Sequence, residues 1–427
     1  MSLSRRDFLR SSAVTAGSVA LLSGVQSCEP KSEAATPAAG PLDELRPFPT
    51  EVPGITVDER KSRIEKAQKL MTENKIEAIY LDGGTSMEYF TGIRWGNSER
   101  MMAAIITQHG EIVYVGPHFE EERIRELMTI GTEVRVWEEH ESPYQVVAGI
   151  FKDKGIRTGK IGMEERVRFF LYDGIRQAAP HLQYQSADAV TAACRLIKSP
   201  AELALMQRAN DITITAYKAA LTMLKEGMSQ GELAGIIADA HKRLGASGGA
   251  FSSFGAATAF PHGSNVPQQL KAGDMVLIDG GCRVGGYSSD ISRTVVFGEP
   301  TKRQLEIWNL EKEAQAAGFD AAKLGEPCEN VDIAARKVIT SAGFGPGYKV
   351  PGLPHRTGHG IGMDGHEWGN MVLGNKQILV PGMCFSIEPT ISIYGEFGIR
   401  LEDCAYMTES GVKWFTQPSP SIAQPVA

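Results

Sequence analysis

Four carboxylates and one imidazole in the C-terminal half of the chain could together bind hard divalent cations. Each of them lies in a strand-like or glycine-flanked stretch. In a shared buried pocket, each charge that no opposite charge compensates would destabilise the folded state by roughly several kcal/mol. Two bound metal ions would neutralise this set and would also supply hydrolytic chemistry. The five residues are Asp279, Asp290, His359, Glu388 and Glu402.

Asp279 and Asp290 lie in two β-rich runs within residues 274–297, on either side of a glycine-containing turn, and this pattern is typical of a β-hairpin. A turn centred between Val284 and Gly285 places Asp279 directly opposite Asp290. Directly opposed side chains on one face are about 5 Å apart at their Cβ atoms, close enough for two carboxylates to hold the same ions. We therefore expect this hairpin to present a pair of ligands.

Residues 383–407 repeat the pattern, because a turn centred on Gly395 places Glu388 opposite Glu402. Like charges that oppose each other directly are destabilising in an antiparallel pair. A lone acid in a hairpin is best read as an ordinary surface residue. Two opposed acidic pairs, in strands rich in Val, Ile, Leu and Phe, instead favour a compensating cation.

Three histidines lie within residues 354–367, interleaved with glycines that allow close backbone approach to a crowded site. Such a cluster could be a zinc site of its own, but no cysteine pairs at zinc-finger spacing accompany it. The full set of four carboxylates and one imidazole suits Mn²⁺ and is compatible with Co²⁺, Zn²⁺ or Fe²⁺. The three histidines are His355, His359 and His366.

The chain resembles the pita-bread dinuclear metallopeptidases, in particular the branch of Xaa-Pro aminopeptidases and prolidases. The resemblance covers the chain beyond its first 28 residues and implies an α/β (α+β) fold, with a creatinase-like N-terminal domain before a pita-bread catalytic domain. The metal-free creatinases of this superfamily lack the full ligand set. The five ligands present here therefore argue against a metal-free creatinase. The motifs that carry the resemblance are Asp279, Ser289–Thr294, Gly358–Gly362, Ser386–Pro389 and Gly398–Asp403.

The resemblance also implies a place for each ligand around two ions. Asp279 would bind one ion, and Asp290 and Glu402 would bridge both. His359 and Glu388 would complete the two coordination shells. A hydroxide bridging the ions would then attack the carbonyl of an Xaa-Pro peptide bond.

Further catalytic roles follow from the same resemblance. Glu388 would relay a proton from the water to the prolyl nitrogen, and His262 would stabilise the tetrahedral intermediate. His355 and His366 would contact the substrate around the scissile bond. Arg400, two residues from a ligand on the same strand face, would orient carboxylates or contact the substrate.

The N-terminal residues predict an export signal. The run Ser4–Leu9 resembles the twin-arginine motif, and the short apolar stretch that follows suits a signal segment better than a membrane span. Val25–Cys28 loosely resembles a lipobox, although Gln26 is less typical. We therefore expect the twin-arginine export machinery as a partner. The expected location is the periplasm, with lipid anchoring at Cys28 or release as a soluble protein.

The organisation follows from composition and helix signals. Residues 1–28 are expected as the signal, 29–57 as a flexible linker, 58–193 as the creatinase-like domain and 194–427 as the catalytic domain. Asp58 would cap a helix that runs to Asn74. Capping boxes at Ser199 and Ser229 predict two helices, the first running towards Leu224. Strands are expected over 78–81, 103–106, 112–115 and 134–137.

Composition excludes some functions and leaves others open. The formal net charge of −7 and the absence of a basic patch argue against nucleic acid as a partner. With Cys28 set aside, five of the six cysteines remain, and this odd count predicts no disulfide framework. A small-molecule C–N hydrolase, a lyase and a non-catalytic binding module remain alternatives on this fold. The sequence does not separate an aminopeptidase from a dipeptidase, and it allows a homo-oligomer whose subunits cap the cleft.

Overall fold

The computed structural model describes residues 40–426. The predicted signal segment and Cys28 lie outside these residues, and both stay predictions. Within residues 40–426, no helix is long and apolar enough to cross a membrane.

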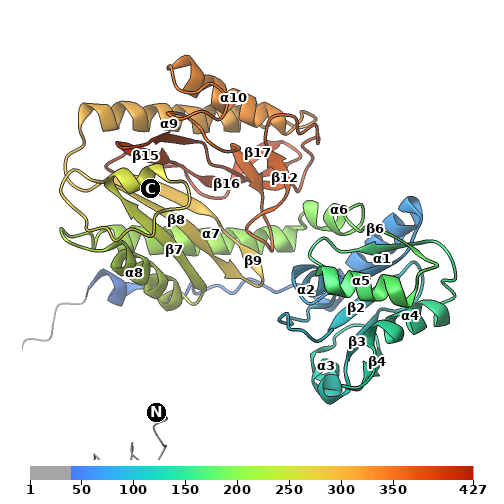
Figure 1. Cartoon of the computed structure of the whole chain (residues 1–427). Coiled ribbons are helices and arrows are strands. Elements are labelled where there is room, and N and C mark those ends of the chain that lie inside the picture. The colour runs from blue at the N-terminus through green and yellow to red at the C-terminus, as the bar shows by residue number, and fades with distance from the viewer. Residues whose placement is uncertain (1–39, 427) are drawn as a thin grey trace, which may run out of the picture. The chain divides into compact units, whose positions relative to one another are not determined.

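A six-stranded mixed sheet organises the first part of the chain (Figure 1). Its strand order is β4-β3-β2-β1-β5-β6. The β1–β2 and β2–β3 pairs are antiparallel, whereas the remaining pairs are parallel. The four strands expected from the sequence are all present. The strands are β1 (Ile76–Asp82), β2 (Ala103–Thr107), β3 (Val113–Pro117), β4 (Glu133–Trp137), β5 (Lys160–Met163) and β6 (Gln183–Ser186).

Helices cover both faces of this sheet. Successive residues of β1 point to opposite faces, so Ile79 and Leu81 pack in one apolar cluster while Ala78 and Tyr80 pack in another. The first cluster includes residues of α1, α2 and α3, and the second includes residues of α4 and α5. The helices are α1 (Val57–Asn74), α2 (Thr85–Thr91), α3 (Glu121–Leu127), α4 (Pro143–Asp153), α5 (Phe169–Ala178) and α6 (Thr191–Leu196), with a 3-10 turn η2 (His118–Glu120).

The first residues of three helices can be compared with the capping residues predicted from the sequence. The capping boxes at Ser199 and Ser229 are both present and begin α7 (Pro200–Leu221) and α8 (Gln230–Arg243). The first of these helices ends slightly before the predicted Leu224. The expected cap of α1 at Asp58 is wrong, because Thr56 is the capping residue and accepts a hydrogen bond from the backbone N–H of Glu59.

The second half of the chain packs its strands between two helix pairs (Figure 1). Apolar residues of α7 and α8 pack against β7, β8 and β10, and those of α9 (Lys302–Ala321) and α10 (Glu329–Ser341) pack against β14 and β15. The five described cysteines are all buried and free, as expected. Besides the 3-10 turn η3 (Gly255–Ala259), the strands are β7 (Ser247–Phe254), β8 (Met275–Val284), β9 (Tyr287–Ser288), β10 (Ile291–Val296), β11 (Gly358–Gly360), β12 (Glu367–Met371), β13 (Cys384–Ile387), β14 (Thr390–Ile393), β15 (Phe397–Arg400), β16 (Asp403–Thr408) and β17 (Gly411–Trp414).

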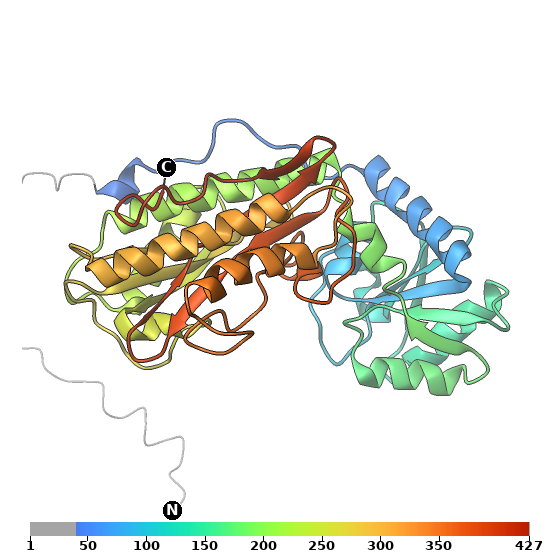
Figure 2. The same ribbon diagram turned by 90° about the horizontal axis from the view of Figure 1, so that it is seen from above.

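Residues 40–56, which we call the strap, run alongside α7 before α1 begins (Figure 2). The strap opens with the 3-10 turn η1 (Pro41–Glu44), and the Arg208 guanidinium donates a 2.6 Å hydrogen bond to the carbonyl of Thr50. The linker expected over residues 29–57 is therefore packed in its second half. Apolar strap residues that contact the α7 and α8 region are Leu42, Leu45 and Phe48.

Candidate metal centre

The first acidic hairpin differs from its predicted register. Asp279 in β8 lies opposite Ser292 of β10, and the turn consists of Gly285 and Gly286, both with positive φ. The expectation that Asp279 directly opposes Asp290 is therefore wrong. The turn lies one residue later along the chain, which shifts the pairing by two residues. Because side chains alternate with a period of two, both carboxylates still lie on the same face, as diagonal neighbours.

The second acidic hairpin has its predicted register. Strands β14 and β15 pair around Gly395, and β13 and β16 continue the same register further from the turn. Glu388 and Glu402 lie between the two paired segments, opposite each other. The predicted pairing of Glu388 opposite Glu402, around a turn centred on Gly395, is therefore confirmed.

Ser292 joins the two hairpins. It forms a bridge with Glu402, and its hydroxyl Oγ lies 2.8 Å from Oδ1 of Asp279 and 2.8 Å from Oε2 of Glu402. A hydroxyl carries a single proton and can donate it to one of these oxygens at a time. Arg400 donates from Nε to the same hydroxyl at 2.9 Å and from Nη2 to Asp279 at 2.5 Å. One buried serine and one buried arginine therefore hold carboxylates of both hairpins.

His359 enters the cluster from β11 and is 1% exposed. Its Nδ1 lies 3.1 Å from the Gly360 carbonyl, and this contact favours a proton on Nδ1. The Nε2 atom, which then has a free lone pair, lies 3.1 Å from Oε1 of Glu388 and 3.9 Å from Oδ2 of Asp290. Side chains at Gly358 and Gly360 would collide with the backbones of Ser386 and Trp368, so glycine is required for this close strand approach.

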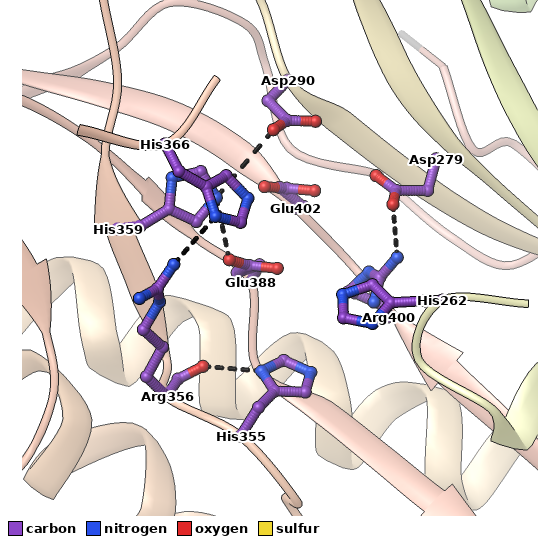
Figure 3. Close-up of a pocket in the computed structure, with 10 residues that line it drawn as sticks. All are labelled: His262, Asp279, Asp290, His355, Arg356, His359, His366, Glu388, Arg400 and Glu402. Carbon is purple, nitrogen blue, oxygen red and sulfur yellow. Dashed lines mark hydrogen bonds and ion pairs between the residues drawn. The ribbon is translucent and has the colours of Figure 1, made fainter. Parts of the chain in front are cut away.

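The donor groups form overlapping sets suited to more than one ion (Figure 3). Within each set, the donor atoms lie within 4.8 Å of one another. Asp290, His359 and Glu402 each belong to two sets. Of these three, only the carboxylates of Asp290 and Glu402 offer two ligand oxygens, so they are the ones suited to bridge two ions. His366, not predicted as a ligand, also belongs to one of the sets. The sets are Asp279 with Asp290 and Glu402, His359 with Glu388 and Glu402, and Asp290 with His359 and His366.

Electrostatics within the cluster favour bound cations. Burial, reinforced by Asp279, raises the pKa of Asp290 to about 7, and burial with three neighbouring acids raises the pKa of Glu402 well above its ordinary value. Burial alone would raise the pKa of Glu388, but His359 in its protonated form outweighs burial and lowers that pKa to about 2, and Glu388 in turn raises the pKa of His359. The Oε1 atom of Glu402 is buried without a hydrogen-bond partner among the described residues. Divalent ions would satisfy this oxygen and compensate the carboxylates.

A cavity of about 340 Å³ opens onto the carboxylates and is lined by the remaining predicted site residues. The His355 Nε2 atom lies 3.0 Å from the Thr390 hydroxyl, and the His366 ring stacks on His359 with 3.8 Å between ring centroids. Arg400 also donates from Nη1 to the carbonyl of Pro261, next to His262. The structure thus brings all nine predicted site residues to one cavity.

Arg356 is a cavity residue that the sequence reasoning missed. Its Nη2 atom lies 3.0 Å from Nδ1 of His366, and it forms no ion pair with any acid among residues 40–426. Arg400, the other cavity arginine, is instead paired with Asp279. The position of Arg356 between His355 and His359 could have pointed to the cavity.

Comparison with known proteins places the chain in a family. Residues 63–197 match the Creatinase/Prolidase N-terminal domain, and residues 204–409 match metallopeptidase family M24. The chain is 31% identical over 359 residues to the Xaa-Pro dipeptidase of Lactobacillus helveticus, covering 83% of this chain and 96% of that protein. The chain belongs to metallopeptidase family M24.

Solved structures of M24 relatives share the fold. A dipeptidase from Pyrococcus horikoshii OT3 matches with a TM-score of 0.76 and 30% identity, covering 83% of this chain and 98% of that one. The prolidase from Thermococcus sibiricus matches with a TM-score of 0.78 and 29% identity, covering 84% and 97%. The expected creatinase-like and pita-bread architecture is therefore confirmed. The protein is an M24 metallopeptidase, and its family implies a centre of two divalent metal ions.

Proposed function

We propose that this M24 peptidase hydrolyses the peptide bond that precedes proline in short Xaa-Pro substrates. The observation that carries the proposal is the overlap of the donor sets, in which Glu402 links the two sets that hold two carboxylates or more and Asp290 links a further one, beside a cavity lined by histidines. Relatives named Xaa-Pro dipeptidase and prolidase support the choice of substrate. The predicted ligands are Asp279, Asp290, His359, Glu388 and Glu402.

Two divalent cations, when bound here, supply an activated water and a Lewis acid for the scissile carbonyl. Glu388 lies at the cavity wall, where its carboxylate can take a proton and pass it to the prolyl nitrogen as the C–N bond breaks. His262 faces the same space and can donate a hydrogen bond to the substrate as charge develops on its carbonyl oxygen. His355 lines the cavity too, but its ring nitrogens lie 2.7 Å from the Arg356 carbonyl and 3.0 Å from the Thr390 hydroxyl, so it contacts the substrate through its ring edge. Arg400 holds Asp279 in place.

Arg356 favours a dipeptide over a longer peptide. It is the cavity cation without an acidic partner among the described residues, and a guanidinium forms strong, often bidentate, hydrogen bonds with a carboxylate. In an Xaa-Pro dipeptide, proline carries a free carboxylate one residue from the scissile bond. A longer peptide or an amide lacks that charge at this place.

A direct assay tests the proposed function. The purified protein is incubated with Ala-Pro, with Ala-Pro-amide and with Ala-Pro-Ala, each with and without added Mn²⁺. We expect cleavage that depends on the metal, and faster cleavage of the free dipeptide. Cleavage of none of the three would contradict the proposal and would favour a small-molecule C–N hydrolase or a lyase. Equal cleavage of all three would contradict only the dipeptide preference.

The native ion and the location belong to the same proposal. Oxygen donors with one imidazole support Mn²⁺, and metal analysis of protein purified without chelators tests this choice.

The run Ser4–Leu9 supports twin-arginine export, and Cys28 supports a lipid anchor. Replacing Arg5 and Arg6 with Lys should retain the protein in the cytoplasm, and Cys28→Ala should release it from the membrane fraction. Unchanged fractionation in either variant would contradict the corresponding assignment.

A further inference from the structure

His366 reaches the cavity from the loop between β11 and β12, and its own side chain is exposed. Its ring stacks on His359, and Arg356 is its one hydrogen-bond partner among the described residues. A single hydrogen bond restricts the ring only weakly. What fixes its position must lie largely in the backbone of the loop that carries it.

That loop is held on both sides of His366 by one arginine. The Nη2 atom of Arg195 donates to Oδ2 of Asp364 at 2.6 Å and to Oε1 of Glu367 at 2.5 Å. Lys198 donates to the other oxygen of Glu367 at 2.9 Å. Arg195, Asp364, Glu367 and Lys198 form what we call the clamp.

The clamp is buried and closely packed. The side chains of Arg195, Lys198 and Glu367 are 1–2% exposed and that of Asp364 is 8% exposed. A Cβ atom at Gly362 would lie 2.6 Å from Oε2 of Glu367 and 2.7 Å from Cε of Lys198. The loop therefore cannot shift without breaking buried ionic hydrogen bonds, which cost much more to lose than exposed ones.

The clamp also connects the cavity to the domain with the six-stranded sheet. Arg195 lies in α6, within the match to the Creatinase/Prolidase N-terminal domain. Oδ1 of Asp364 accepts hydrogen bonds from Thr85 Oγ1 at 2.8 Å and from Arg166 Nη1 at 3.1 Å. The N-terminal domain thus contacts the loop two residues before His366.

We propose that Arg195 is a positioning residue for catalysis, which sets the place of His366 in the cavity by holding Asp364 and Glu367 together. The inference rests on the proposed Xaa-Pro peptidase function, in which His366 contacts the substrate. A guanidinium bridges two carboxylates, whereas an ammonium on a flexible stem acts as a point charge. The N-terminal domain then contributes to turnover through this contact.

A double-mutant cycle tests the proposal with Ala-Pro as substrate and Mn²⁺ present. Arg195→Gln should lower kcat/KM by about 10- to 100-fold in the wild-type background, because small misplacements of a site group cost that much. In a His366→Ala background, the same change should cost less than about twofold, because the group it positions is gone. Equal losses in both backgrounds, or no loss in the first, would overturn the proposal.

Two further variants separate positioning from folding. Arg195→Lys keeps a buried charge, so it should remain folded yet lose most of the same activity. Arg63→Gln is the matched control, since Arg63 is 6% exposed and pairs with Glu202 at 3.3 Å but lines no part of the cavity. This control should lower the melting temperature while kcat/KM stays within about twofold. Full activity of the folded Arg195→Lys variant would overturn the need for a bridging guanidinium.

A spectroscopic readout keeps the two proposals separate. In protein labelled with ¹³C on histidine rings, the signal absent from His366→Ala identifies the His366 ring. We expect that signal to shift or broaden in Arg195→Gln and to stay unchanged in Arg63→Gln. An unchanged signal in Arg195→Gln would overturn positioning. If the wild-type protein cleaves no Xaa-Pro substrate, the proposed function fails, and the ring signal still reports whether the clamp holds His366.

Discussion

The two acidic hairpins each place two carboxylates on one face, but their strand registers differ. In the hairpin of β8 and β10, the carboxylates of Asp279 and Asp290 are diagonal neighbours across a Gly-Gly turn. In the hairpin that turns at Gly395, Glu388 and Glu402 oppose each other directly. The two hairpins meet where Ser292 pairs with Glu402. A shared ion site therefore needs carboxylates on one face, and it tolerates different positions along the strand.

The difference also shows which errors of register matter. A shift by one residue would send Asp290 to the far face, whereas the observed shift of two residues keeps it with Asp279. Two consecutive glycines with positive φ are typical of a two-residue hairpin turn, and that signal fixes the correct register. The turn residues are therefore a better guide to pairing than the ligands themselves.

The largest expected effect separates the members of the first hairpin. Asp290 belongs to two donor sets and Asp279 to one. Asp290→Ala should therefore abolish both activity and retention of two ions, whereas Asp279→Ala should retain one ion per chain. Metal content measured by mass spectrometry, alongside melting temperature, checks this. Two ions retained by Asp290→Ala would refute its bridging position.

Arg356 belongs to neither hairpin, so its replacement should separate ion retention from substrate binding. Arg356→Gln should raise KM for Ala-Pro by roughly 10- to 100-fold, the value of a charge-assisted hydrogen bond, and leave metal content unchanged. The KM for Ala-Pro-amide should change little. If both substrates lose affinity equally, Arg356 does not bind the proline carboxylate.

Ser292→Ala tests the junction between the hairpins. Its hydroxyl contacts Asp279, Glu402 and Arg400. Groups that orient metal ligands typically contribute 10- to 100-fold in metal affinity, and we expect roughly the lower value because Arg400 still holds Asp279. Titration with Mn²⁺ measures the change. Unaltered Mn²⁺ affinity would show that each hairpin is positioned by itself.

The smallest expected effect compares the two turns. Gly395 has φ of 87° and open space around its Cα, so Gly395→Ala should cost only about 1 kcal/mol of unfolding free energy. At Gly286, an added Cβ would also lie 2.9 Å from Oε1 of Glu88. Gly286→Ala should therefore cost more in urea unfolding. Equal costs would show that Glu88 moves aside freely.

Local patterns predicted local structure well. The capping boxes at Ser199 and Ser229 begin helices as expected, because the signal lies within four residues. The five predicted ligands lie together because hairpin pairing and the family resemblance both constrain them. The clamp could not be predicted in this way. Arg195 meets Glu367 across 172 positions of the chain, and no local spacing indicates that contact.

The strap has a practical consequence for anyone shortening this protein. A version that begins at Val57, where α1 starts, would remove Leu42, Leu45 and Phe48 from their contacts with the α7 and α8 region. The newly exposed apolar surface would then face solvent, and such surfaces promote aggregation. The shortest version that keeps this apolar surface covered should therefore begin near Gly40. That start lies upstream of Arg63, where the match to the Creatinase/Prolidase N-terminal domain begins.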